Sequence, residues 1–265
     1  MDPYTFRAGR TPLLVSMPHT GTHVPEALLA RLTPAARALP DTDWHLERLY
    51  DFLDDLGASV LVARHSRYVV DLNRPPDDAN LYPGHDTTGL VPTDTFHKEP
   101  LYAAGDEPGA AEIADRVAKY WKPYHATLAA ALADLKRRHR IALLWDAHSI
   151  LSVVPRFFEG RLPALNLGTA DGRSCDPAIG EVLLQIAQRA SGFGAVLDGR
   201  FKGGYITRTY GRPEQGVHAV QLELSEATYM EESAPFAFRE DLAARLRPNL
   251  RALLGAFLER AFMQP

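Results

Sequence analysis

Three short apolar runs in this chain of 265 residues each lead to a side chain that can bind a metal or move a proton. The runs cover residues 13–19, 141–148 and 217–223, and they end on His19, His148 and Glu223. Such runs are typical of buried strands in an open α/β sheet, which binds ligands at the carboxyl ends of its strands. The pattern therefore predicts that these three side chains lie at one edge of a sheet.

The remaining sequence alternates between strand and helix patterns. Strands are predicted at residues 13–17, 59–63, 68–72, 141–145, 164–167, 195–197 and 219–224. Helices are predicted at 43–56, 109–140 with a bend near Pro123, 177–189 and 236–262, and a Gly-rich hairpin or loop at 199–211. We expect an α/β fold of three layers, with helices on both faces of a mostly parallel or mixed sheet. No segment resembles a linker, so one domain is expected over residues 1–265.

One long segment, residues 75–108, has no helical or strand period and is rich in Pro, Gly, Thr and Asp. A stretch of roughly thirty residues without regular structure inside a compact domain is usually either disordered or functional. This segment carries aromatic and apolar side chains, among them Tyr82, Leu90 and Phe96. We therefore expect an ordered loop over the site that forms a lid or a pocket wall.

The composition excludes several classes of protein. Twenty-nine basic and 33 acidic side chains give a net charge of -4, which argues against a nucleic-acid partner. Cys175 is the only cysteine, which rules out an intramolecular disulfide and a Cys-rich zinc site. The N-terminal residues lack a signal-peptide core, and no apolar run approaches the roughly 18 residues of a membrane span. We expect a cytoplasmic protein without a membrane partner, and a monomer is compatible with the sequence.

His19 and His148 are the leading candidates for metal ligands. A catalytic zinc takes about three ligands from His and carboxylate side chains and keeps one position open for water. Asp146 lies two residues before His148, so both side chains point to the same face of a strand, where Asp146 could orient the imidazole or act on the water. The third ligand is left open among Asp43, Asp41, Glu26 and His23. We favour Asp43, although either aspartate could simply cap a helix.

Glu223 is the candidate general base. It lies between Leu222 and Leu224 in an otherwise apolar strand. A buried acid is costly unless it is paired or functional. A metal lowers the pKa of bound water to about 7, and a nearby carboxylate must then take its proton and pass it to the leaving nitrogen. The alternative is a structural ion pair between Glu223 and an arginine.

Several arginines predict an anionic substrate. Arg67, Asn73 and Arg74 surround the run at 68–72, and an arginine fork beside an amide suits a carboxylate. Arg208 follows two glycines that would let a loop approach a ligand closely. These glycines lack the spacing of a dinucleotide or phosphate-binding loop. The sequence therefore predicts an anionic substrate and no nucleotide site.

Six segments together resemble one known family. They are SMPHTG at 16–21, DTDW at 41–44, SRYVVDLNR at 66–74, DAHS at 146–149, GRFKGG at 199–204 and QLEL at 221–224. In these segments the chain resembles the N-formylglutamate amidohydrolases, or N-formylglutamate deformylases, of bacterial histidine degradation. That family is similar in fold to the zinc carboxypeptidases and to aspartoacylase. The resemblance implies hydrolysis of N-formyl-L-glutamate, a small dicarboxylate, to formate and L-glutamate.

The resemblance also implies roles for single residues. His19 and His148 would hold one zinc ion, or another divalent metal, per chain; Glu223 would be the base; and Asn73 and Arg74 would meet the substrate. The chain departs from the carboxypeptidase pattern at Thr22, where a glutamate ligand would be expected. A related amidohydrolase or carboxypeptidase acting on another N-acyl amino acid or a peptide is the nearest alternative. A serine hydrolase is disfavoured because no Gly-x-Ser-x-Gly motif occurs. A non-catalytic binding protein with a structural zinc is disfavoured because such a zinc usually has four ligands, often cysteines, and the chain has one cysteine.

Overall fold

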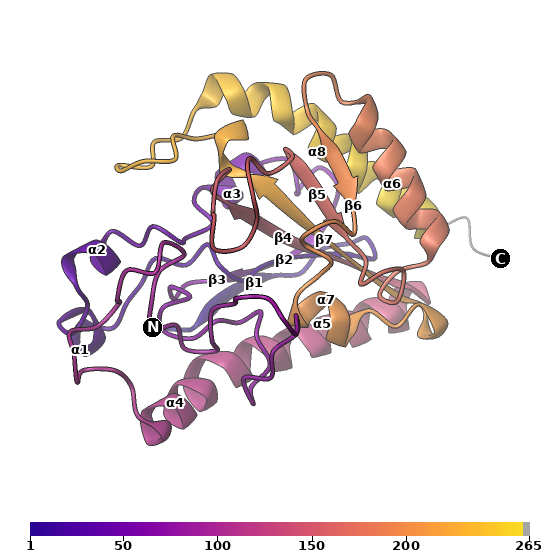
Figure 1. Cartoon of the computed structure of the whole chain (residues 1–265). Helices are drawn as coiled ribbons and strands as arrows, with labels where there is room; N and C mark the ends of the chain where they lie inside the picture. The colour runs from indigo at the N-terminus through magenta and orange to yellow at the C-terminus, as the bar shows by residue number, and fades with distance from the viewer. Residues whose placement is uncertain (262–265) are drawn as a thin grey trace.

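A mixed sheet of seven strands organises residues 1–261, the part of the chain that the computed structural model describes (Figure 1). The strands are β1 (Tyr4–Arg7), β2 (Leu13–Met17), β3 (Ser59–Ala63), β4 (Ala142–Ile150), β5 (Leu165–Gly168), β6 (Ala195–Leu197) and β7 (Val217–Ser225). Their order across the sheet is β1-β3-β2-β4-β7-β5-β6. The strands β3, β2, β4 and β7 run parallel, whereas β1 is antiparallel to β3 and β5 is antiparallel to β7. The predicted mixed sheet is confirmed.

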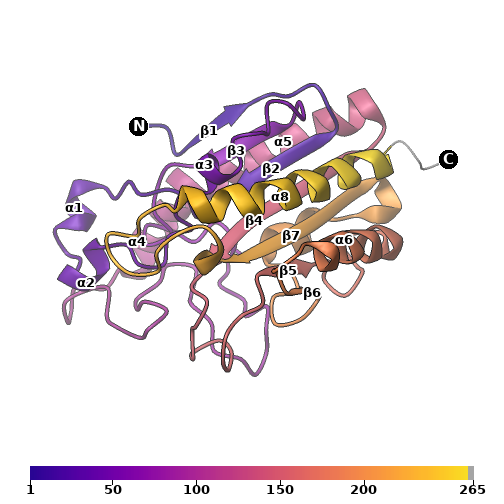
Figure 2. The same cartoon turned by 90° about the horizontal axis from the view of Figure 1, so that it is seen from above.

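Helices cover both faces of this sheet, as the two views in Figures 1 and 2 show. The helices are α1 (Glu26–Leu29), α2 (Pro34–Arg37), α3 (Leu46–Leu49), α4 (Ala110–Arg116), α5 (Lys122–His139), α6 (Pro177–Arg189), α7 (Tyr205–Tyr210) and α8 (Glu240–Ala261). Short 3-10 turns occur at Pro213–Gln215 and Glu226–Thr228. Helices α6 and α8 pack on one face, and α5 packs on the other. The expected three-layer α/β arrangement is therefore confirmed.

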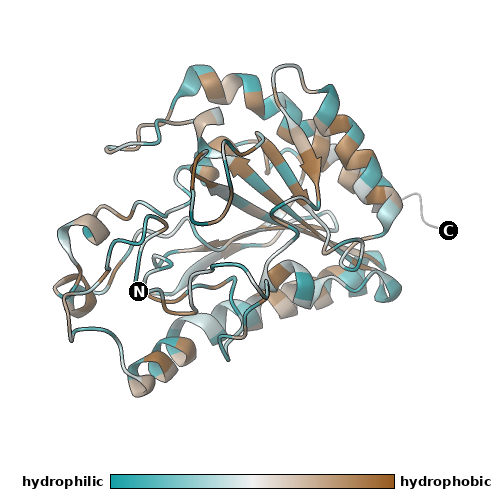
Figure 3. Cartoon of the chain, in the orientation of Figure 1, coloured by the Kyte–Doolittle hydropathy of each residue, from teal (hydrophilic) through white to brown (hydrophobic). Residues whose placement is uncertain are grey.

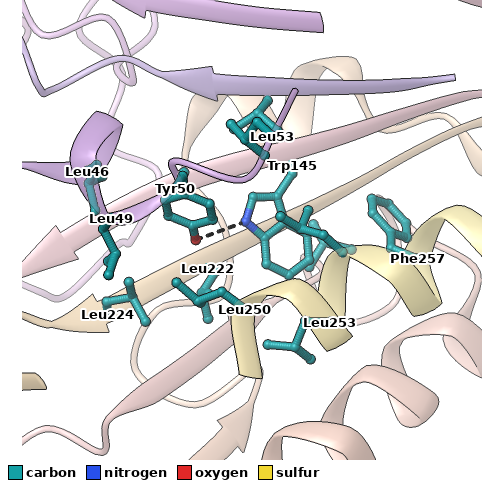
Figure 4. Close-up of a cluster of buried hydrophobic side chains, with 14 of the residues drawn as sticks. Leu46, Leu49, Tyr50, Leu53, Trp145, Leu222, Leu224, Leu250, Leu253 and Phe257 are labelled. Atoms are coloured by element: carbon teal, nitrogen blue, oxygen red, sulfur yellow. Dashed lines mark hydrogen bonds between the residues drawn. The ribbon is translucent and has the colours of Figure 1, made fainter. Parts of the chain in front are cut away.

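The apolar content of the strands explains this layering, because β2, β3 and β4 are buried along their whole length. Figure 3 shows the hydrophobic residues concentrated in the sheet and on the helix faces that meet it. Under α8, Trp145 packs near Phe257 and donates a hydrogen bond from Nε1 to the Tyr50 hydroxyl at 3.3 Å (Figure 4). Burial of a large apolar side chain contributes about 1.5–3 kcal/mol. No helix within residues 1–261 is long and apolar enough to cross a membrane.

Several predicted elements are confirmed. The long helical segment consists of α4, a π-helical turn at Val117–Trp121, and α5, so its irregularity directly precedes Pro123. Asp176 accepts a hydrogen bond from the backbone N–H of Ala178 and caps α6, as predicted. Residues 75–108 contain no helix and no strand beyond isolated bridges. Helix α8 begins at Glu240 rather than at 236, and the predicted helix end at Phe262 lies outside the described residues.

The predicted helix at 43–56 is wrong, because only α3 forms within it. His45 adopts a left-handed conformation with φ of 62°, which interrupts a regular helix, and residues 50–57 form turns. The Asp43 carboxylate accepts a hydrogen bond from the backbone N–H of Ser149, across the sheet edge, instead of capping a helix. The apolar residues of helical period here pack on the sheet without needing a continuous helix.

The predicted strand at 68–72 is also wrong. Val69 donates its backbone N–H to the carbonyl of Ser66, which makes a turn, and Asp71 donates to the carbonyl of Leu90 in the 75–108 segment. Tertiary contacts thus override the β propensity of this run.

The predicted hairpin or loop at 199–211 contains helix α7 instead. Gly204 precedes it, and a Cβ there would lie 2.4 Å from Asn73 Nδ2, so the glycine permits a close approach between the two segments. The backbone N–H of Ile206 donates to Asn73 Oδ1 at 2.8 Å. This contact, which no local pattern reveals, ties the start of α7 to the segment after residue 70.

Candidate metal centre and pocket

Three side chains from separate segments form a group that could hold a metal ion. His19 follows β2, Asp43 precedes α3, and His148 lies in β4, and their ligand atoms all lie within 4.8 Å of one another. Asp43 Oδ2 is 3.1 Å from His148 Nδ1 and 3.8 Å from His19 Nδ1. Two imidazoles and one carboxylate, all buried, are a donor set that suits a catalytic divalent metal with a position left open.

Of the four candidates for the third position, Asp43 is the one that belongs to this group. Asp41 accepts hydrogen bonds from the Tyr68 hydroxyl at 2.7 Å and from the backbone N–H of Phe96 at 3.0 Å. His23 packs edge-on against His65, and Glu26 is exposed in α1. The Asp43 backbone N–H donates to the carbonyl of His19 at 3.1 Å, which holds this loop against the end of β2.

Each histidine also contacts a carboxylate through its other ring nitrogen. His19 Nε2 lies 2.7 Å from Asp71 Oδ1, and His148 Nε2 lies 3.2 Å from Asp146 Oδ2. Such contacts orient metal-binding imidazoles and select their tautomer. The Asp146 contact agrees with the orienting role considered from the sequence. The role of Asp71 was missed, although its place two residues before Asn73 was a usable signal.

The two imidazoles differ in their electrostatics. Burial, with the nearby Arg67 guanidinium, lowers the pKa of His19 below its usual value. Burial alone would lower the pKa of His148 too, but the Asp146 and Asp43 carboxylates raise it well above the usual value. Burial would raise the pKa of the Asp71 carboxyl, yet His19 and Arg67 hold it well below its usual range. The centre is therefore a dense group of buried charges that compensate one another.

Glu223 lies directly across from His148 in the pairing of β7 with β4. Both strands continue past these residues, to Ile150 and Ser225, so the prediction that they end there is wrong. Because the two strands extend together, the pair is held by regular sheet hydrogen bonds.

Glu223 accepts a hydrogen bond from Gln221 Nε2 at 3.2 Å. Within residues 1–261 no arginine or lysine pairs with it, so the structural ion pair considered as an alternative is absent there. Burial raises the pKa of the Glu223 carboxyl to about 8. A carboxyl tuned in this way suits proton transfer near neutral pH.

A pocket that is partly open to solvent lies over this centre. His19, His148 and Glu223 line it from the sheet. The segment 75–108 contributes Tyr82, Asp86, Thr87 and Phe96. The prediction that this segment forms a pocket wall is confirmed.

The predicted substrate-binding residues differ in position. Arg67 lines the pocket, but its Nη2 pairs with Asp71 Oδ2 at 2.6 Å and its Nη1 lies 4.0 Å from Asp43 Oδ1. Asn73 also lines it, with Nδ2 at 2.9 Å from His148 Nε2. Arg74 lines it and donates to the Thr88 hydroxyl at 3.3 Å.

Arg208 is not among the residues that line the pocket. Its Nε donates to the carbonyl of Gly203 at 2.7 Å, and its guanidinium lies 5.0 Å from the centre of the Tyr82 ring. Arg200, which sequence reasoning did not single out, lines the pocket instead. Its place in the Gly-Arg-Phe-Lys-Gly-Gly segment was the available signal.

Comparisons with known proteins found one family with a similar sequence. The sequence model of one family, described as N-formylglutamate amidohydrolase, matches residues 11–230. A curated protein named N-formylglutamate deformylase from Pseudomonas aeruginosa is 57% identical over 254 residues, which cover 96% of this chain and 95% of that protein. One of the same name from Pseudomonas putida is 52% identical with the same coverage.

Two solved structures share the fold. The crystal structure of N-formylglutamate amidohydrolase from Ralstonia eutropha JMP134 has a TM-score of 0.82 at 24% identity and covers 99% of this chain and 98% of that one. A gene product of Agrobacterium tumefaciens has a TM-score of 0.73 at 18% identity, over 98% of this chain and 96% of that one.

Proposed function

Because this chain belongs to the N-formylglutamate amidohydrolase family, we propose that it hydrolyses N-formyl-L-glutamate to formate and L-glutamate. The observation that carries the proposal is the 57% identity to a curated N-formylglutamate deformylase over nearly the whole of both chains. The pocket supports it, since cationic side chains and a candidate metal centre share one cavity.

We propose His19, Asp43 and His148 as the ligands of one zinc ion per chain, with another divalent metal as the alternative. The convergence of three buried donor atoms of the right types supports this set. When bound, the metal supplies polarisation of the formyl carbonyl and activation of a water molecule. Asp71 and Asp146 would fix the two imidazoles so that both Nδ1 atoms face the metal position.

Glu223 would remove a proton from the attacking water and deliver it to the departing amine nitrogen. Its burial in the pocket and its raised pKa support both halves of this role, because the carboxyl can gain and lose a proton near neutral pH. Gln221 would hold the carboxyl in place through its amide.

Arg74 would bind a substrate carboxylate, with Asn73 beside it. Arg67 would neutralise Asp71 and Asp43 and contact the substrate with the part of its guanidinium that lines the pocket. For Arg208, the contacts with Gly203 and Tyr82 support a role in holding the pocket wall, in place of the substrate contact predicted from the sequence.

Several broader expectations from the sequence and from the resemblance stay predictions. They are a role in histidine degradation, a cytoplasmic location, a likeness to zinc carboxypeptidases and a single catalytic domain over residues 1–265. A small dicarboxylate remains the expected substrate class.

Rates on three substrates test the proposed reaction. The protein is expected to hydrolyse N-formyl-L-glutamate far faster than N-acetyl-L-glutamate or a short peptide with a C-terminal glutamate. A clear preference for either of the others would replace the proposed substrate by another N-acyl amino acid or by a peptide.

A further inference from the structure

Two arginines in the pocket form no ion pair with the described residues of the protein. Arg74 and Arg200 both line the cavity, and neither forms an ion pair within the described part of the chain. Arg67, in the same cavity, pairs with Asp71 at 2.6 Å. A partly buried cation without a counter-ion is costly, so a pocket with two of them is incomplete without an anionic ligand.

The contacts of Arg200 leave one edge of its guanidinium for a ligand. Its Nε donates to the carbonyl of Phe157 at 2.5 Å, and its guanidinium lies 5.3 Å and 5.4 Å from the ring centres of Phe201 and Tyr82. These contacts fix the plane of the group but use neither Nη1 nor Nη2 within residues 1–261. Two parallel N–H groups on a fixed plane are the geometry that binds a carboxylate bidentately.

The surroundings of Arg200 differ from those of Arg74. Arg74 follows Asn73 and Asp71, the residues that contact the two candidate histidine ligands. The wall that carries Arg200 is apolar: Phe157, Phe201 and Ile150 line the pocket there. The α-carboxylate of the substrate is fewer covalent bonds away from the formyl group than the side-chain carboxylate is. The α-carboxylate would therefore lie nearer to the candidate metal centre and to Arg74. The apolar wall would meet the methylene groups that separate the two carboxylates.

Resting on the proposed function, we propose that Arg200 is the residue that determines specificity for the side-chain carboxylate of the substrate, while Arg74 binds the α-carboxylate. The protein would then select N-formyl dicarboxylic amino acids over N-formyl amino acids with neutral side chains. Burial lowers the pKa of both arginines, although Asp71 partly raises that of Arg74, and Tyr82 and Glu223 partly raise that of Arg200. An anionic ligand would stabilise the charged form of both side chains.

The test compares N-formyl-L-glutamate with N-formyl-L-glutamine, which has the same shape without the side-chain charge. In Arg200→Met, kcat/KM for N-formyl-L-glutamate is expected to fall about 10²–10³-fold, mainly through KM, because a charge-assisted bidentate contact is lost. For N-formyl-L-glutamine the change should stay within about 3-fold. Arg74→Met should lose activity on both substrates and keep their ratio.

Two further variants control for folding and for general charge. Arg200→Lys should keep part of the preference, since the charge remains and the fork is lost. Lys202→Met removes a neighbouring cation that pairs with Asp171 outside the pocket, and should leave both rates unchanged. Inhibition by L-glutamate relative to L-glutamine gives a binding readout of the same preference.

The outcomes separate this assignment from the proposed reaction. If the wild type hydrolyses N-formyl-L-glutamate but Arg200→Met loses both substrates equally, or neither, the assignment of Arg200 is overturned and the reaction stands. If the wild type does not hydrolyse N-formyl-L-glutamate, the proposed reaction is overturned and the assignment with it. If Arg200→Met, and no other variant, loses the preference for N-formyl-L-glutamate over N-formyl-L-glutamine, the result supports both the proposed reaction and the assignment of Arg200.

Discussion

The arginines that line the pocket fall into two groups with opposite electrostatic surroundings. Arg67 pairs with Asp71, and neighbouring carboxylates raise its pKa although burial alone would lower it. Arg74 and Arg200, in contrast, form no ion pair in the described chain, and burial lowers the pKa of both. Charges that satisfy one another hold a centre in place, whereas charges that lack a partner are available to a ligand.

Glu223 is the unpaired acid of the pocket: it is buried and has no cationic partner within residues 1–261. If it is the base, Glu223→Gln should lower kcat by about 10²–10⁴-fold while metal content and melting temperature stay near wild type. Steady-state kinetics, metal analysis and thermal unfolding check this. Wild-type turnover in the variant would refute the base, and lost stability with retained turnover would mean that the group is structural.

Metal binding should be sensitive to the loss of Asp71, which pairs with Arg67. Asp71→Asn keeps the size of the side chain but removes the charge that meets both His19 and Arg67. We expect metal affinity and kcat/KM to fall about 10–100-fold, the usual cost of losing a contact that orients a metal-binding histidine. Metal titration of the stripped protein measures this. Unchanged affinity would mean that the Asp71 contact does not position His19.

A third histidine, His125, supports the segment that carries Asn73 and Arg74. His125 Nε2 donates to the carbonyl of Leu72 at 2.8 Å, and its ring stacks on Trp121, whose Nε1 donates to the carbonyl of Arg74. Burial lowers the pKa of His125 to about 4. The unfolded chain, with an ordinary pKa near 6.5, then binds a proton that the folded protein does not.

This contribution to stability is fully present above about pH 6.5 and is lost as pH falls towards 4. Between pH 7 and pH 5 the free energy of unfolding should fall by about 2 kcal/mol through His125. Urea unfolding at both pH values checks this, with His125→Phe as the comparison. The variant should be less stable at pH 7 yet lose less stability at pH 5; an equal loss in both proteins would contradict the account.

The smallest effect is expected at Arg208, which is not among the residues that line the pocket. Arg208→Met should lower kcat/KM only a few-fold, because it removes a contact with Gly203 and the face of Tyr82 but no pocket-lining group. If Arg208 binds substrate, as the sequence predicted, the loss will match that of Arg200→Met. That result would add Arg208 to the residues that bind substrate.

Local patterns in the sequence predicted strands β2 to β7, the cap at Asp176 and the irregular segment at 75–108, but they missed β1. They also placed His19, His148 and Glu223 together, because apolar runs reveal buried strands wherever they occur. Residues that act through distant contacts were harder to predict. The residues after Asp43 have a helical period in the sequence, but Asp43 does not cap a helix there. Hydrogen bonds with His19 and Ser149, from other segments, hold it in place.

The arginines show the same limit. Arg67, Arg74, Arg200 and Arg208 are alike as sequence letters, and only the spatial arrangement shows that Arg67 pairs with Asp71 and that Arg208 lies outside the pocket lining. The arginines in the sequence predicted an anionic substrate, but which arginine would bind it depends on tertiary contacts.

Metal content is the most direct test of the central claim, that His19, Asp43 and His148 hold a catalytic metal. The wild type should contain close to one zinc ion per chain and lose activity on N-formyl-L-glutamate when chelated, with recovery on adding zinc. Asp43→Ala should lose the metal, whereas Asp41→Asn, a neighbouring acid bound to Tyr68 and Phe96, should keep it. Full activity after exhaustive chelation, or an Asp43→Ala protein that keeps its zinc, would contradict the account.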